Sequence, residues 1–268
     1  MTASISTPRP SAVVAPSALG LLPGFGGLVR KELTEWRRAR RSWIVFLVSA
    51  GFMTLSALNS WLQTVLPEEA TEGAAPPILD PMMNLVASVS AQIFVVAAIF
   101  AVMALITAER ESGILAWTAS KPVSRSGIWL AKFLSGTGVL WIVAGLLPLV
   151  ATVALITVLY GGLPILPIVV MAIGIGLAIA LYVAVALAAS TVVSSQAAVA
   201  AIAIGVMFLP QILGLLLPSA EYLPTSILEW SMRLGLGEPA SFVTPISYLV
   251  SVSALVAFSL RRMERMEL

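Results

Sequence analysis

Six long stretches without a charged residue constrain this sequence more than any other feature. A helix needs about 20 apolar residues to cross the hydrocarbon core of a bilayer, and each stretch is close to that length. Only 10% of the 268 residues are charged, whereas a soluble domain has about a quarter. We therefore predict an all-α polytopic membrane protein whose six transmembrane helices lie at 42–62, 83–107, 134–160, 165–189, 197–217 and 242–260.

The positions of the basic residues predict how these six spans are oriented. All but one of the 15 lysines and arginines lie before the first span, between the second and third, or after the sixth. The exception is Arg233, between the fifth and sixth spans. Cytoplasmic segments of membrane proteins are enriched in Lys and Arg. We therefore expect both termini in the cytoplasm, a multi-pass protein of the cell membrane, and outer loops at 63–82 and 218–241.

The segments around the spans carry fewer signals. Residues 1–27 hold four prolines among Ser, Thr and Gly, which predicts a flexible N-terminal tail before one membrane domain at 28–268. In the second outer loop, SILEWSMRLG predicts a short helix on which Ile227, Trp230 and Leu234 share a face. A lid over the exit and a simple spacer are both open for it. Pro148 predicts a kink in the long third span.

The residue inventory excludes most kinds of chemistry. The chain has no Cys and no His, which removes thiolate nucleophiles, Cys/His zinc sites and imidazole acid–base catalysis. Lys31, Lys121 and Lys132 are followed by Glu, Pro and Phe, whereas a P-loop needs Ser or Thr after its lysine. We therefore expect no enzyme activity, no catalytic residue, and no cofactor or metal site in this chain. The net charge of +2 gives no reason to expect a nucleic-acid partner.

An amphipathic helix is predicted at 28–41, directly before the first span. Its apolar residues recur at helical spacing, and its basic face includes Arg37, Arg38 and Arg41. Such a helix can lie in the headgroup layer with its basic side toward anionic lipid, which makes membrane lipid an expected partner. The alternative is that these basic residues only anchor the chain on the cytoplasmic side, with no more specific role. Glu32 lies on the apolar face, where a carboxylate is costly unless paired, so we expect its partner in the next loop.

The loop at 108–132 carries both charges and large apolar residues. Its helix is expected to continue past the second span as far as Pro122, because the residue before a proline disfavours the helical conformation. Ser124 or Ser126 can then cap the helix of the third span. This combination predicts a docking surface for another protein, and a solvated turn whose charges only orient the spans is the alternative. The candidate docking residues are Glu109, Arg110, Glu111, Gly113, Leu115, Trp117, Lys121, Pro122 and Arg125.

Two segments resemble those of the type-two ABC permeases, the six-span membrane subunits of ATP-driven exporters. The likeness lies in Glu109-Arg110-Glu111-x-Gly113-x-Leu115, in Ser120-Lys121-Pro122-Val123-Ser124-Arg125, in Lys132, and in LVRKELTEWRRARRSW before the first span. Ile114 and Ala131 depart from the family's usual Thr and Gly, which leaves the subfamily open.

The resemblance implies a function for the loop. In that family it forms a coupling helix that sits against a separate ATPase subunit, which binds the ATP. The charged triplet at 109–111 would hold the loop through salt bridges, with Glu32 opposite Arg110 or Arg125, while Leu115 and Trp117 would supply buried contact. A second permease subunit, the same or similar, would complete the pathway. The resemblance thus implies an ABC exporter permease.

Two other functions are weighed against this one. A non-transporting membrane scaffold or sensor partner would use the same loop to bind a cytoplasmic protein and would need no nucleotide. An intramembrane enzyme is disfavoured, because the spans hold no His, Cys or carboxylate to serve as a base.

Overall fold

The computed structural model describes residues 24–66, 80–114, 124–214 and 222–265, and the part of the chain within these ranges contains helices and turns but no strand. Six helical segments are long and apolar enough to cross a membrane, which confirms the predicted all-α six-span architecture. Spans one to six are Arg40–Val65, Pro81–Glu109, Arg125–Tyr160, Ile165–Ser190, Gln196–Gly214 and Val243–Glu264.

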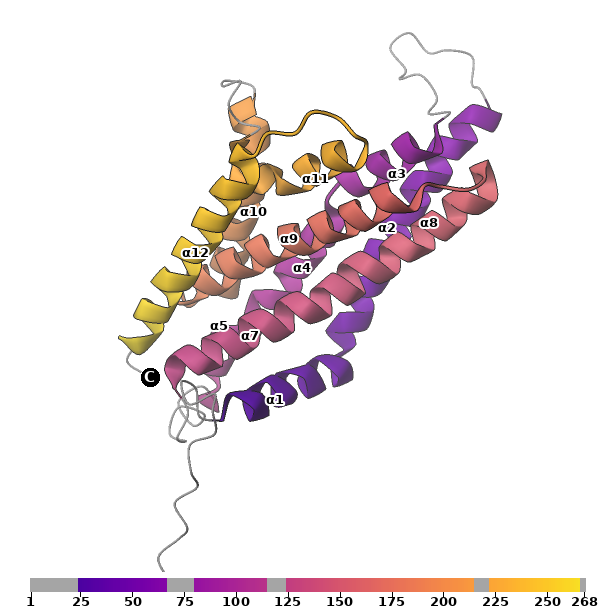
Figure 1. The fold of residues 1–268 in the computed structure, drawn as a ribbon. Helices are drawn as coiled ribbons and strands as arrows, with labels where there is room; N and C mark the ends of the chain where they lie inside the picture. Colours follow the sequence, from indigo (N-terminus) through magenta and orange to yellow (C-terminus); the bar gives the residue numbers. More distant parts are fainter. Residues whose placement is uncertain (1–23, 67–79, 115–123, 215–221, 266–268) are drawn as a thin grey trace, which may run out of the picture.

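The helices lie side by side with a separate helix at one end (Figure 1). The elements are α1 (Phe25–Arg38), α2 (Arg40–Val65), α3 (Pro81–Ser90), α4 (Ile93–Val102), α5 (Ala104–Glu111), α7 (Arg125–Leu140), the π-helical turn η1 (Trp141–Leu146), α8 (Leu147–Tyr160), α9 (Ile165–Ser190), α10 (Gln196–Gly214), the 3₁₀ turn η3 (Pro224–Ser226), α11 (Ile227–Gly235) and α12 (Val243–Glu264). We call the end that bears α1, the start of α7 and the last turn of α12 the basic end, and the opposite one the far end.

Span two is three helices in succession rather than the single helix that was expected. It begins at Pro81, where the Asp80 carboxylate accepts hydrogen bonds from the backbone N–H groups of Met82 (2.7 Å) and Met83 (3.2 Å). Between α3 and α4, Gln92 adopts a left-handed conformation with φ 52°. That conformation is uncommon for a residue with a side chain and costs free energy, so span two carries local backbone strain near its middle.

Span three begins nine residues earlier than expected, at Arg125. The Ser124 hydroxyl caps it by accepting a hydrogen bond from the Gly127 N–H at 3.0 Å, as the sequence predicted. Pro148 does not break the helix. The preceding turn, η1, is π-helical, and the Leu147 N–H bonds to the carbonyl of Ile142, five residues back. The extra residue in this turn accommodates the missing N–H and the ring of the proline.

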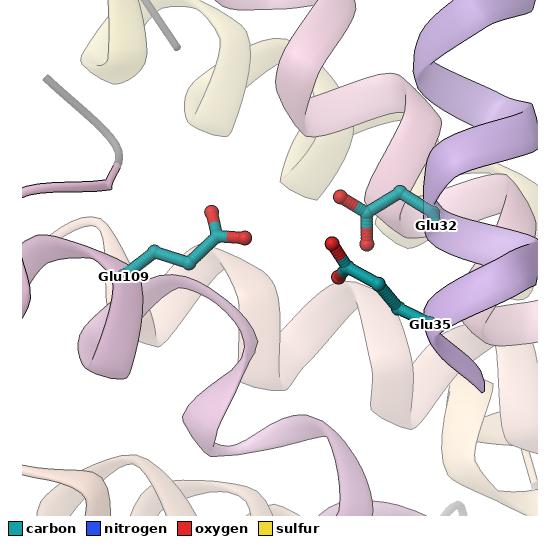
Figure 2. A group of neighbouring side chains, drawn as sticks. All are labelled: Glu32, Glu35 and Glu109. Carbon is teal, nitrogen blue, oxygen red and sulfur yellow. The ribbon is translucent and has the colours of Figure 1, made fainter. Parts of the chain in front are cut away.

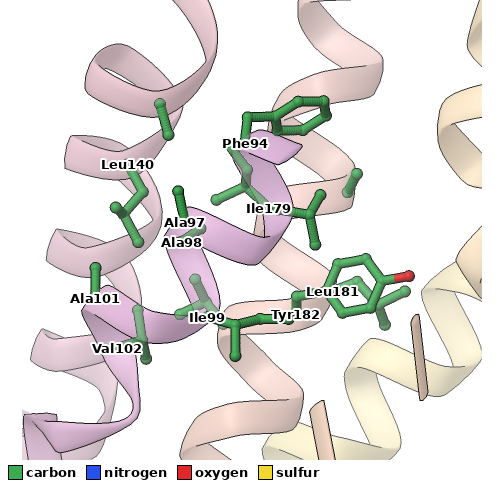
Figure 3. Close-up of a cluster of buried hydrophobic side chains, with 14 of the residues drawn as sticks. Phe94, Ala97, Ala98, Ile99, Ala101, Val102, Leu140, Ile179, Leu181 and Tyr182 are labelled. Carbon is green, nitrogen blue, oxygen red and sulfur yellow. The ribbon is translucent and has the colours of Figure 1, made fainter. Parts of the chain in front are cut away.

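The centre of the bundle is built around α4, which packs against α2 and α9, with Leu140 at the end of α7 beside its buried face (Figure 3). Ala97, Ala98 and Ala101 are buried on it, and such small side chains let neighbouring helices approach closely. At the far end, the buried Asn84 amide donates to the Ala57 carbonyl at 3.1 Å and to the Tyr160 hydroxyl at 2.9 Å. This polar contact ties spans one, two and three together where no water can replace it.

The segment between spans five and six folds back into the bundle as a hairpin made of η3 and α11. Gly174 lies between two and three turns inside α9, and a Cβ atom there would overlap the Ser231 hydroxyl of α11. The expected helix is present, and its buried residues are not the three that were expected to share a face. Ile227, Leu228, Ser231 and Met232 are buried, while Leu234 is 46% exposed. The close approach at Gly174 turns the small Ser231 inward, which an apolar pattern cannot indicate.

Candidate functional site

The amphipathic helix α1 packs along α7 at the basic end. Its buried stripe is Leu28, Glu32 and Trp36, which recur every four residues and therefore lie on one face. The helix ends at Arg38, and Ala39 is extended, so the elbow into span one comes three residues before the position expected near Ser42. The predicted bounds 28–41 thus become 25–38. The Ser42 hydroxyl donates to the Trp36 carbonyl at 2.8 Å and so satisfies one free carbonyl at the helix end.

A buried lysine joins three segments that are far apart in the sequence. The Nζ atom of Lys132 lies 3.0 Å from Oε1 of Glu32 and 2.9 Å from Oε1 of Glu109. The lysine side chain is 1% exposed, and those of Glu32 and Glu109 are 4% and 16% exposed. Buried charges are tolerated only when they are paired, so each of these three side chains requires the others. The contact fixes α1 and the end of α5 against the start of α7.

Further charges surround this contact. Nζ of Lys31 lies 3.3 Å from Glu35, 3.7 Å from Glu109 and 3.9 Å from Glu32, measured to Oε1 of each. Burial alone would lower the pKa of Lys31, but the carboxylates of Glu109, Glu35 and Glu32 outweigh it and raise the pKa above its ordinary value. The guanidinium of Arg41, 4.3 Å above the Trp36 ring, interacts electrostatically with the same three carboxylates. We call Glu32, Glu35, Glu109, Lys31 and Lys132 the ionic cluster.

The three carboxylates of the ionic cluster converge from two helices (Figure 2). One oxygen of each lies within 4.8 Å of the others, a spacing at which carboxylates can hold a cation. Two ammonium groups already lie among these oxygens. The cluster therefore has its positive charge from its own lysines, and its geometry is that of a buried salt-bridge network that connects helices.

The described partner of Glu32 is Lys132. The family resemblance implied Arg110 or Arg125 in the loop, and the side chain of Arg110 lies outside the described part of the chain. Lys132 was noted in the family pattern but was not among the candidate site residues. Its signal in the sequence is its position, since it lies two turns inside an otherwise apolar helix once α7 is known to begin at Arg125. The expectation of a partner for Glu32 is confirmed by Lys132.

The remaining candidate residues fall into three groups. Glu111, at the end of α5, is exposed, and Gly113 follows in a left-handed turn with φ 73°, after which Ile114 is again helical. The expected continuation toward Pro122 lies outside the described part of the chain. Arg125 is the first residue of α7, and neighbouring Ser126 donates to Oε1 of Glu264 in α12 at 2.8 Å. Arg37 and Arg38 are exposed. The residues Leu115, Trp117, Lys121 and Pro122, and the side chain of Arg110, lie outside the described part of the chain.

Two sequence comparisons bear on this chain. A sequence model of the family described as ABC-2 family transporter protein matches residues 27–265. The match includes α1, the ionic cluster and all six spans. No curated protein matches the chain.

Proposed function

Because the chain belongs to the ABC-2 family of transporter proteins, we propose that it is the permease subunit of an ATP-driven exporter and docks a separate ATPase through the loop after span two. Proteins of this family are membrane subunits and not ATPases, so the energy source is a second protein. In this proposal the basic end faces the cytoplasm, where Lys and Arg are enriched, and the protein resides in the cell membrane.

The ionic cluster is the observation that supports this role most directly. The docking loop leaves from the end of α5 and returns at the start of α7. Glu109 lies just before the loop and Lys132 lies after it. Lys132 pairs with Glu109 and also with Glu32 of α1. A displacement of the loop is therefore passed on to spans two and three and to α1 together, as a coupling element requires.

The docking contact itself is proposed from the sequence of the loop. Leu115 and Trp117 are the apolar anchors, because buried aromatic side chains supply much of the energy of an interface. Glu111 and Arg125 flank them and fix orientation more than affinity, as charges at an interface rim do. This division of roles predicts that Trp117 matters for binding and the flanking charges for the rate of association.

A second permease subunit is part of the proposal, because six spans supply half of a pathway. Spans one, five and six bury the smallest share of their residues within the chain. Large apolar side chains such as Trp43 (67% exposed), Phe242 (79%) and Val158 (83%) remain for lipid and for the other subunit. The pathway would lie between the two subunits and would open alternately as the two ATPases close and separate.

Copurification tests the docking proposal. The full chain, tagged at its C-terminus, is coexpressed with P-loop ATPases from the same source and purified in mild detergent. We expect a stoichiometric ATPase with the wild type and its loss on Trp117→Ala. The matched control is Trp43→Ala, which removes an exposed tryptophan of span one and should leave the ATPase bound.

Three outcomes would count against the proposal. If no ATPase copurifies, the proposed exporter has no source of energy. If Trp117→Ala retains both the ATPase and transport in vesicles, the loop is not the docking element. If a protein without a P-loop is captured instead, the scaffold function becomes the better hypothesis.

A further inference from the structure

A groove of about 570 Å³ opens between spans four, five and six. Its walls are aliphatic and aromatic, and they include Leu181 and Val185 of α9, Ile202 and Val206 of α10, and Leu255 and Phe258 of α12. Small-molecule sites in proteins measure about 300–1,000 Å³, whereas a water molecule takes about 30 Å³. The groove is therefore large enough for a ligand and too apolar to be held open by water.

The groove covers part of the depth of the membrane. At one end it is lined by Val192, in the turn after α9 at the basic end. At the other end it is lined by Pro224 and Thr225, at the tip of the hairpin, and by Ser251, about two turns inside α12. The deep end thus lies between helices of the bundle, about two turns from the far end of α12.

Two hydroxyl groups mark this deep end. Thr225 is 6% exposed, and its Oγ1 atom is buried without a hydrogen-bond partner. The Ser251 hydroxyl also forms no hydrogen bond within the described ranges. Several serines of the bundle behave differently: Ser60, Ser88 and Ser259 each donate to the carbonyl four residues back. Both hydroxyls line the same apolar groove, and the buried one, that of Thr225, calls for a partner.

We propose that this groove binds a long-chain amphiphile whose apolar body lies between α9, α10 and α12 and whose hydroxyl, ester or amide group hydrogen-bonds to Thr225 and Ser251. In hydrocarbon no water can satisfy these hydroxyls. A ligand with a hydrogen-bonding group therefore gains binding free energy there that a plain alkyl chain does not. Rotation about χ1 of Thr225 exchanges its methyl group and its hydroxyl, which can thus turn toward the ligand.

The depth of the hydroxyls separates this ligand from a bulk membrane lipid. A bilayer lipid keeps its polar group at the membrane surface. In the groove, the hydroxyls that would bind a polar group lie near the hairpin tip, inside the bundle. A helix of a second subunit would fill the walls with apolar side chains and would leave the hydroxyls unpaired. The ligand is therefore an elongated, mostly apolar molecule whose polar group travels or rests inside the membrane.

A pair of photoreactive probes tests the proposal. The full chain, alone in lipid nanodiscs and without an ATPase, is exposed to a long-chain alcohol carrying a mid-chain diazirine, or to the alkane in which methyl replaces the hydroxyl. Mass spectrometry of the labelled peptides is the readout. We expect the alcohol to label α10 and α12 at the groove roughly fivefold more than the alkane, the factor that one typical net hydrogen bond supplies.

Variants of the two hydroxyls complete the test. Thr225→Val combined with Ser251→Ala should reduce labelling by the alcohol to the level of the alkane, and Thr225→Ser should retain it. Ser253→Ala, an exposed hydroxyl on the same helix, is the matched control and should change nothing. A melting curve in detergent confirms that each variant is folded.

Three results would overturn the proposal. Equal labelling by both probes would mean that the groove accepts any alkyl chain. Labelling outside the groove would place the site elsewhere, and a dimeric chain that excludes both probes would show that a second copy covers the groove. Since no ATPase is present, each result is independent of the docking proposal.

Discussion

Replacing Lys132 with methionine tests how strongly the ionic cluster holds the basic end together. Methionine keeps an unbranched side chain of similar length but removes the ammonium group that both Glu32 and Glu109 contact. Breaking a buried ion pair by removing one partner costs about 3–5 kcal/mol, because the remaining charge is left buried. In a chain of this size 1 kcal/mol moves the melting temperature by roughly 2–4 °C, so we expect a fall of roughly 6–20 °C.

The assay is a melting curve of the purified chain in mild detergent, followed by fluorescence or by size-exclusion chromatography. The matched control is Glu229→Gln, which breaks a pair whose atoms are closer, at 2.7 Å, but whose side chains are 42% and 59% exposed. An exposed pair within one helix contributes only about 0.3–0.5 kcal/mol, so this control should melt close to the wild type. The contrast separates the effect of burial from that of distance.

A second substitution identifies the cause of the loss. In the Lys132→Met chain, Glu32→Gln replaces the most buried uncompensated carboxylate with a neutral amide and should recover a large part of the melting temperature. The reasoning is refuted if Lys132→Met melts within the range of the Glu229→Gln control. It is equally refuted if Glu32→Gln lowers the melting temperature of Lys132→Met further.

The remaining predictions concern packing, a polar contact and pH. Gly174→Ala should cost about 1–3 kcal/mol, because its Cβ would overlap Ser231, whereas Gly205→Ala, with open space around it, should be neutral or stabilising in the same melting assay. Asn84→Leu should cost about 1–3 kcal/mol by removing a buried amide and the two hydrogen bonds that it donates to spans one and three, which the melting temperature also reports. The raised pKa of Lys31 means that its contribution is full below the ordinary value of 10.5 and is lost as the pH rises through the raised value. The difference in melting temperature between the wild type and Lys31→Gln should therefore stay constant from about pH 7 to 10 and disappear above, and a difference that disappears below pH 9 would contradict this assignment.

The number and type of spans could be predicted because an uncharged, apolar stretch of this length is stable in a bilayer as a transmembrane helix, which satisfies its own backbone hydrogen bonds. The boundaries were less predictable where a charge is paired. Span three was expected at 134 because Lys132 is a lysine, but its partners Glu32 and Glu109 allow it to lie inside the helix. These partners are 100 and 23 residues away in the sequence, beyond any local pattern.

The candidate site was predictable in its location and less so in its contacts. The unusual position of Glu32 on an apolar face indicated a buried partner, and the structure contains one. The strain at Gln92 had no such signal, since it lies within a continuous uncharged stretch. Only its packing environment determines that the chain turns there. Sequence reasoning therefore indicated the buried partner of Glu32 but missed the break in span two.

Because of the π-helical turn η1, the two halves of span three turn different faces toward the bundle. Each residue of a helix advances by 100°, so the extra residue in Trp141–Leu146 rotates everything that follows relative to everything before it. Before the turn the helix packs on α1, α9 and α12, and after it on α2 and α3. Deleting one residue of η1 would bring the two halves back into phase, and either the ionic cluster or the contact with span one would then face lipid. The single extra residue thus rotates the second half of the helix, so that the two halves pack against different sets of helices.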